Sequence, residues 1–155
     1  MTEIQNLLSY RLHKVANLLS RGAELRYRRE FGVSLWEWRT LALLGAAAGP
    51  LSLNHLAHAA GIHKSQMSRV VSALAERKLV VRSADEEDAR GVRLALSKPG
   101  RRLYDGLISA ASDRDAAFRR CLSVDEREVL DRVLAKLGGK ARELIQREKD
   151  RKSVV

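Results

Sequence analysis

The sequence predicts a mainly α-helical fold with one small β-hairpin. Apolar residues recur at helical spacing along most of the chain, whereas residues 79–96 show the alternation and β-branched composition of strands. Glycine and proline stand at the points where one helical pattern stops and the next begins. A chain of 155 residues with 45% apolar residues is long enough to form a single domain with its own core.

Two helices are predicted before residue 50. The first covers about residues 4–30, where the apolar residues keep a helical period and Gly32 follows as a breaker. Ser34 is the expected N-cap of the second helix, over residues 35–47, and Gly49-Pro50 ends it.

Two shorter helices joined by a tight turn are predicted next. The first covers residues 52–60 with Ser52 as N-cap, and Gly61 supplies the left-handed conformation that ends it. The second covers residues 63–78. Its predicted inner face consists of four apolar residues at helical spacing: Met67, Val70, Val71 and Leu74.

A hairpin follows these helices directly. Residues 79–81 and 92–96 are β-formers, and the polar stretch 83–91 between them is too long for a two-residue turn. The order helix, turn, helix and β-wing is that of the winged helix-turn-helix, in which the second helix of the pair enters the DNA major groove.

The outer face of the predicted helix 63–78 has the chemistry that such a role requires. Ser65, Gln66, Ser68, Arg69 and Ser72 are short hydroxyls, an amide and a guanidinium, which can donate to and accept from base edges and phosphates. Gln66 is the candidate for adenine and Arg69 for guanine or a phosphate. Two further residues at the N-terminal end are expected to meet phosphates: His63 and Lys64. The alternative is an ordinary solvated helix face.

The hairpin also carries a family pattern. Leu79-Val80, the loop motif Asp85-x-x-Asp88-x-Arg90 and the exit Leu94-x-Leu96-Ser97-x-x-Gly100 resemble the MarR family of bacterial transcription regulators. The flanking helices match that family in length and order. Two positions differ, because Lys78 stands where the family usually has glycine and Glu86 where it usually has proline.

The resemblance implies roles for the wing. Arg90 is expected to enter the minor groove, where the electrostatic potential is most negative, and Asp88 to orient it or tie the wing to the body of the domain. Arg93 is a secondary candidate for a phosphate contact. The alternative is an ordinary charged hairpin loop, since the acidic residues 85–88 would repel DNA if all of them faced the phosphates.

Two long helices are predicted after the wing, over residues 99–121 and 124–149. Pro99 suits the first turn of one, and Ser123 with Glu126 forms a capping box that opens the other. Gly138-Gly139 is expected to kink this last helix or end it early.

The apolar stripes of the terminal helices predict a homodimer. A winged module of about 50 residues is too small to cover stripes on three outside helices, whereas a two-fold related copy would cover them. We therefore expect one domain over residues 1–155, with a winged lobe at 32–99 and dimerisation helices at 1–31 and 100–150. The alternative is a monomer whose stripes cover one another.

The family resemblance also implies an effector, since relatives commonly bind small aromatic acids in a cleft between the two regions. The tentative ligand-binding residues are Tyr10, His13, Trp36, Trp38 and Arg39. Arg39 could pair with a carboxylate. Aromatic residues at helical spacing are more often part of a core, and Trp38 occupies a frequent core position of the family.

Other reactive residues receive ordinary interpretations. His55, His58 and His63 could suggest a metal site, but zinc needs further ligands and no cysteine is near them. Cys121 is the single cysteine, and a buried packing role is preferred to a redox role. No metal or cofactor is expected.

Composition sets the remaining expectations. The net charge of +10 favours a polyanionic partner, although the excess is spread over the whole chain. A membrane span and a secretory signal are not expected, and one cysteine fits the reducing cytoplasm. Enzymatic sequence motifs such as a P-loop or H-E-x-x-H do not occur in the sequence.

The sequence therefore predicts a cytoplasmic, dimeric regulator that binds double-stranded DNA at a pseudo-palindromic operator. By resemblance it is a repressor relieved by a small aromatic acid. The alternative is an architectural protein that binds DNA without sequence preference.

Overall fold

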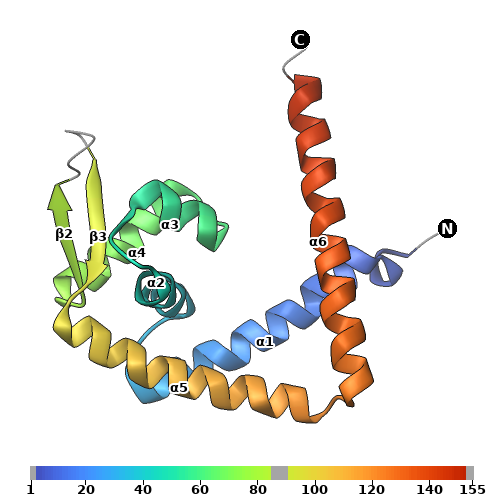
Figure 1. The fold of residues 1–155 in the computed structure, drawn as a ribbon, viewed down its shortest axis with the longest axis horizontal. Coiled ribbons are helices and arrows are strands. Elements are labelled where there is room, and N and C mark those ends of the chain that lie inside the picture. The colour runs from blue at the N-terminus through green and yellow to red at the C-terminus, as the bar shows by residue number, and fades with distance from the viewer. Residues whose placement is uncertain (1–2, 85–90, 153–155) are drawn as a thin grey trace. The chain divides into compact units, whose positions relative to one another are not determined.

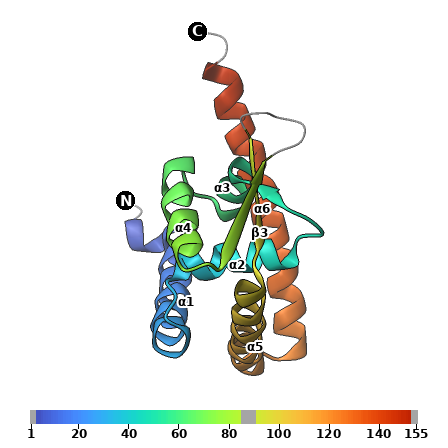
Figure 2. The ribbon, with the colours of Figure 1, turned by 90° about the vertical axis from the view of Figure 1, so that its left-hand side faces the viewer.

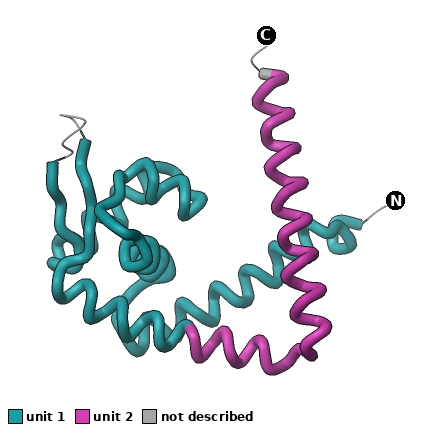
Figure 3. Tube along the Cα trace, in the orientation of Figure 1, with its two compact units in different colours: residues 1–111 teal, residues 112–155 magenta. Residues whose placement is uncertain are grey.

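The computed structural model describes residues 3–84 and 91–152 and confirms a mainly helical fold with a small antiparallel sheet (Figure 1). The elements in chain order are η1 (Ile4–Asn6), α1 (Leu8–Phe31), α2 (Leu35–Ala46), β1 (Leu51–Ser52), α3 (Leu53–Ala60), α4 (Lys64–Glu76), β2 (Val80–Ala84), β3 (Val92–Leu96), α5 (Lys98–Arg120) and α6 (Val124–Lys152). The chain divides into two compact units, Met1–Ala111 and Ser112–Val155 (Figure 3). None of the described helices is long and apolar enough to cross a membrane.

The first unit holds the hydrophobic core. The largest side chains excluded from solvent come from α2, α3, α4, β3 and α5: Leu41, Leu56, Met67, Leu74, Leu94 and Leu107. All of them stand on stripes with helical or strand spacing, so the burial of these residues follows from the sequence pattern.

The helix boundaries in this unit follow the predicted caps closely. The Ser34 N–H donates to Glu37 Oε2 (2.7 Å) and the Glu37 N–H to Ser34 Oγ (3.2 Å), which completes a capping box. Ser52 Oγ accepts from the His55 N–H at 3.2 Å. Gly61 has φ 68°, as expected for a left-handed C-cap.

The end of α4 differs from the prediction, because the helix stops at Glu76 and not at residue 78. Lys78 has φ 58°, and the Leu79 N–H closes the turn on the Leu74 carbonyl (2.9 Å). This left-handed position is the one at which the resemblance noted above expects glycine. A lysine there costs up to about 1 kcal/mol relative to glycine, which the surrounding packing tolerates.

The sheet has three strands in the order β1-β3-β2, all antiparallel. In the register of the hairpin, Val80 lies opposite Leu96 and Ala84 opposite Val92. The hairpin lies alongside α4 (Figure 2). The sheet differs from the sequence prediction in two ways. The strand β1 was not predicted, because a segment of two residues is too short to show alternation. The strand β2 continues to Ala84, so the loop that was expected to begin at residue 83 begins later.

The start of α5 explains the exit motif of the wing. Ser97 Oγ donates to the Lys78 carbonyl (2.6 Å) and accepts from the Gly100 N–H (3.0 Å). A Cβ at Gly100 would lie 1.9 Å from the Leu79 carbonyl oxygen. Only glycine allows this approach, so Ser97-x-x-Gly100 joins the end of α4 to the beginning of α5.

The first helix starts later than predicted. Residues Ile4–Asn6 form a 3-10 turn, Leu7 is extended (φ −68°, ψ 131°), and α1 begins at Leu8. Neither η1 nor α1 has a side-chain N-cap hydrogen bond, so the apolar period alone could not locate this break.

In the second unit the predicted capping box forms, since the Ser123 N–H donates to Glu126 Oε2 (2.7 Å) and the Glu126 N–H to Ser123 Oγ (3.2 Å). The helix does not end early at Gly138-Gly139 but continues to Lys152. The prediction for Cys121 is wrong: its side chain is exposed, because α5 ends at Arg120 and leaves it in the turn, where Sγ donates to the Phe118 carbonyl.

Candidate nucleic-acid interface

The two faces of α4 separate largely as the sequence predicts, although Val70 of the predicted inner face and Ser72 of the predicted outer face are both half-buried. Met67, Val71 and Leu74 are at most 2% exposed and hold the helix on the core. The candidate base-contacting side chains all lie on exposed positions: Ser65, Gln66, Ser68 and Arg69. The core therefore presents this polar face outward over residues 65–69, in the N-terminal half of the helix.

The charge of this face favours an anion. His63 is the exposed N-cap and makes no side-chain cap hydrogen bond, and Lys64 is exposed in the first turn. The first turn contains no acidic residue, and Glu76 is the first carboxylate on the helix. Within residues 3–84 and 91–152, neither Lys64 nor Arg69 has an acidic partner. Both side chains are exposed, and exposed cations on a recognition helix suit contacts to phosphates.

The C-terminal end of α4 is fixed to α2. Arg77 Nη1 donates to Glu37 Oε1 at 3.0 Å, while the other oxygen of that carboxylate serves the Ser34 cap. Thr40, which is fully buried, donates to the Trp36 carbonyl (2.8 Å) and contacts the Met67 sulfur (3.5 Å). Glu37 and Thr40 thus hold α4 in place from behind, a function that the periodicity of α2 did not reveal.

The wing residues divide into two groups. Arg93 lies on β3, half-buried, opposite Ser83 of β2 and Ser52 of β1. Asp88 and Arg90, together with Glu86, lie outside the described residues.

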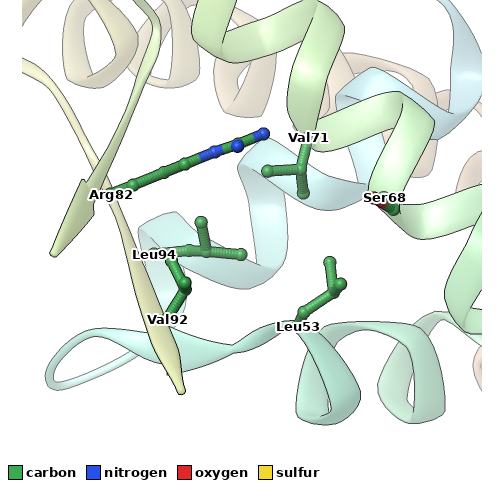
Figure 4. Close-up of a pocket in the computed structure, with 6 residues that line it drawn as sticks. All are labelled: Leu53, Ser68, Val71, Arg82, Val92 and Leu94. Carbon is green, nitrogen blue, oxygen red and sulfur yellow. The ribbon is translucent and has the colours of Figure 1, made fainter. Parts of the chain in front are cut away.

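Arg82 is a member of this region that the sequence analysis treated only as a partner for the acidic loop. It lies on β2, and its Nη2 donates to Ser72 Oγ on α4 at 3.0 Å. Arg82 also lines a cavity between α3, α4 and the hairpin (Figure 4). The alternation of side chains along β2 could have revealed this position from the sequence, because it places Arg82 on the same side of the strand as the buried Val80.

The tentative ligand-binding residues do not all come together. The Arg39 guanidinium lies 4.9 Å above the Trp36 ring, and its Nη2 donates to Ser20 Oγ on α1 (3.3 Å). Trp38 instead packs on the buried Tyr27 ring, with 5.3 Å between centroids.

Two other tentative ligand-binding residues lie further along α1. Tyr10 is 40% exposed, and His13 shares a hydrogen bond with Asn17 (2.8 Å). His13 is roughly two helical turns from Ser20. The structure thus groups Trp36 with Arg39 and places Trp38 in the core.

The histidines considered for a metal have ordinary surroundings. His55, His58 and His63 are exposed at α3 and at the start of α4. Among the residues that the structure describes, no group of three or more His, Cys, Asp or Glu side chains could hold a metal ion.

Comparisons with known proteins agree with this geometry. A family model described as "MarR family" matches residues 31–91. The HTH-type transcriptional regulator FarR of Neisseria gonorrhoeae is 31% identical over 101 residues, which cover 65% of this chain and 68% of that protein.

Solved structures extend the similarity to the whole fold. A MarR/EmrR family transcriptional regulator from Acinetobacter sp. ADP1 has a TM-score of 0.82 and 25% identity, over 92% of this chain and 99% of that one. The Staphylococcus aureus MepR–DNA complex has a TM-score of 0.79 and 22% identity, over 86% of this chain and 98% of that one. Because the MepR structure is only 22% identical to this chain, it shows that the fold is shared and nothing more.

Proposed function

Because this chain belongs to the MarR family of transcriptional regulators, which are DNA-binding proteins and not enzymes, we propose that it reads a specific operator through the polar face of α4. The observation that carries the proposal is the exposure of Ser65, Gln66, Ser68 and Arg69 above a fully buried inner face. Amides, hydroxyls and guanidinium groups distinguish base pairs in the major groove. His63 and Lys64 contact flanking phosphates.

The protein acts as a homodimer. On α1 and α6 many large apolar residues are between 40% and 65% exposed, including Leu18, Leu25, Leu144 and Ile145. Stripes of this length on a monomer would leave large apolar areas in water, and a second copy of the same helices supplies a complementary cover. The α4 helices of the two protomers then lie one DNA turn apart, roughly 34 Å, and the operator is pseudo-palindromic.

The wing completes the contact with DNA. By family resemblance, Arg90 enters the minor groove, Asp88 orients it, and Arg93 supports a phosphate contact. The preference of arginine for a narrow minor groove follows from the strongly negative potential there.

A small aromatic carboxylate relieves repression. Arg39, stacked on Trp36, offers a cation beside an aromatic surface, and this pair is the centre of the proposed site. Tyr10, His13 and Trp38 are tentative ligand-binding residues that lie apart from it. Ligand binding would favour a spacing of the two α4 helices that no longer matches one DNA turn. A repressor of this kind acts in the cytoplasm, where its operator is.

Selection of bound duplexes from a random pool tests the proposal, because it reports sequence preference, palindromy and half-site spacing together. Gln66→Ala and Arg69→Ala should each weaken binding to the selected site by about 1–3 kcal/mol and relax specificity at one position. Gln146→Ala, an amide on α6, is the matched control and should have no effect. Unchanged affinity in both α4 variants would contradict the proposal, and equal affinity for all duplexes would favour the architectural alternative.

A further inference from the structure

The link between Arg82 and Ser72 joins the wing to the outer part of α4. We infer that Arg82 is a DNA phosphate contact, held in position by Ser72 across the gap between the recognition helix and the wing. This inference rests on the proposed mode of DNA binding and adds to it a residue and a role.

The strand register directs Arg82 toward α4. Val80 is 4% exposed and belongs to the core, and side chains two residues apart on a strand share a face. Arg82 therefore points the same way as Val80, and its partner across the hairpin, Leu94, is 1% exposed on that face. Because the core ends at this pair, a long side chain at 82 must continue past the core to the edge of α4.

Apolar packing alone does not fix Arg82 there. A cavity of about 100 Å³ lies between α3, α4 and the hairpin. Its lining residues are Leu53, Ser68, Val71, Arg82, Val92 and Leu94. Figure 4 shows the Arg82 side chain extending from β2 toward α4 along one edge of this space. Within residues 3–84 and 91–152, the hydrogen bond from Nη2 to Ser72 Oγ (3.0 Å) is a directional contact that sets where the guanidinium rests.

The place of this guanidinium matches the path of a DNA strand. When a recognition helix occupies the major groove and a wing occupies the adjacent minor groove, a sugar-phosphate backbone passes between them. Arg82 stands between those two elements and is exposed. A guanidinium has five N–H donors, so a group that donates one to Ser72 can still bind a phosphate with a second edge.

Salt dependence separates a phosphate contact from a merely structural role. Each phosphate neutralised contributes about 0.9 to the slope of log affinity against log salt concentration, so Arg82→Gln should lower the slope of the dimer by about 2. Arg82→Lys should keep most of the slope. Ser72→Ala should keep the slope too, while affinity falls about two- to tenfold because the guanidinium is no longer held in place.

The measurement is fluorescence anisotropy of the full chain with a labelled duplex between 50 and 300 mM salt, roughly the range over which counterion release is measured. Arg102→Gln removes the same charge from an exposed position on α5 and should leave the slope unchanged. If wild type binds the selected duplex and Arg82→Gln keeps its slope, the inference is overturned. If wild type shows no preference for any duplex, the proposed function itself fails, which is a different result.

Discussion

The winged lobe and helix α6 use the same apolar residues at the same spacing, yet their burial is opposite. Leu41, Leu56 and Leu74 in the lobe are fully buried, whereas Leu130 and Leu134 on α6 are 42% and 47% exposed. Because the helix period and the residue types are alike in the two regions, the difference in burial must come from what covers each apolar stripe. The lobe supplies its own cover from neighbouring elements, and we propose that the terminal helices receive theirs from a second copy. Periodicity thus predicts that a stripe exists but not which molecule covers it.

The largest effect is expected from charges placed on the α6 stripe. Leu130→Glu combined with Leu134→Glu would bury unpaired carboxylates in the proposed dimer, four per dimer, which should weaken association by more than about 4 kcal/mol, or roughly a thousandfold. Sedimentation velocity at micromolar concentration should show a monomer. The matched control adds the same charges away from the stripe, as Ala135→Glu with Gln146→Glu, and should remain dimeric. A wild-type monomer would remove the proposed difference between the two regions.

A cavity in the lobe should destabilise the fold itself. Leu74→Ala removes a fully buried side chain and should lower the free energy of unfolding by about 2–5 kcal/mol. Leu25→Ala is the control on a 65% exposed position of α1, and its cost in urea unfolding should be much smaller and should change with protein concentration. Equal, concentration-independent losses in the two variants would mean that the exposed stripes are not an interface.

Much of the fold was predictable because local chemistry decides it. Ser34, Ser52 and Ser123 cap helices through contacts three residues away, and Gly61 ends a helix through its own φ angle. The faces of α4 follow from Met67 and its helical neighbours. Each of these features needs only residues within about one turn, which the sequence displays directly.

Features that depend on distant contacts were missed or misplaced. β1 exists because Leu51 pairs with Leu94, 43 positions along the chain, and two residues carry no period of their own. The Arg82–Ser72 bond and the Arg77–Glu37 ion pair join separate elements, so neither has a local signature. For the candidate site, the sequence located the exposed face of α4, while the roles of Asp88 and Arg90 remain predictions because both lie outside the described residues.

A smaller effect is expected at the left-handed residue that ends α4. Lys78→Gly should stabilise the lobe by up to about 1 kcal/mol, because glycine adopts φ 58° without the steric cost of a Cβ. Lys78→Ala is the control, since it removes the charge but keeps the Cβ and should give no such gain. Thermal unfolding distinguishes them. If alanine stabilises as much as glycine, the lysine charge and not the backbone conformation is responsible.

The smallest effect is expected where α1 meets α5. Hydrogen bonds from Arg29 and then Arg26 lower the pKa of Glu30 below its ordinary value of 4.5, and Arg26 also donates to the Ala110 carbonyl on α5 (3.2 Å). A carboxyl whose pKa is lower in the folded state stabilises the fold above its unfolded pKa, and this contribution disappears as the pH falls through the folded pKa. Glu30→Gln should therefore be slightly less stable than wild type at neutral pH and equal to it in acid.

The arginines give this last prediction its internal control. Because the Arg29 hydrogen bond is the larger cause, Arg29→Gln should return the pKa of Glu30 further toward its ordinary value than Arg26→Gln does, as read from the carboxyl carbon in an NMR titration. Arg26→Gln should in turn cost more stability at all pH values, because it also removes the link to α5. The reverse order in the titration would place the effective contact at Arg26, and the group that holds α1 to α5 would then also be the one that lowers the pKa of Glu30.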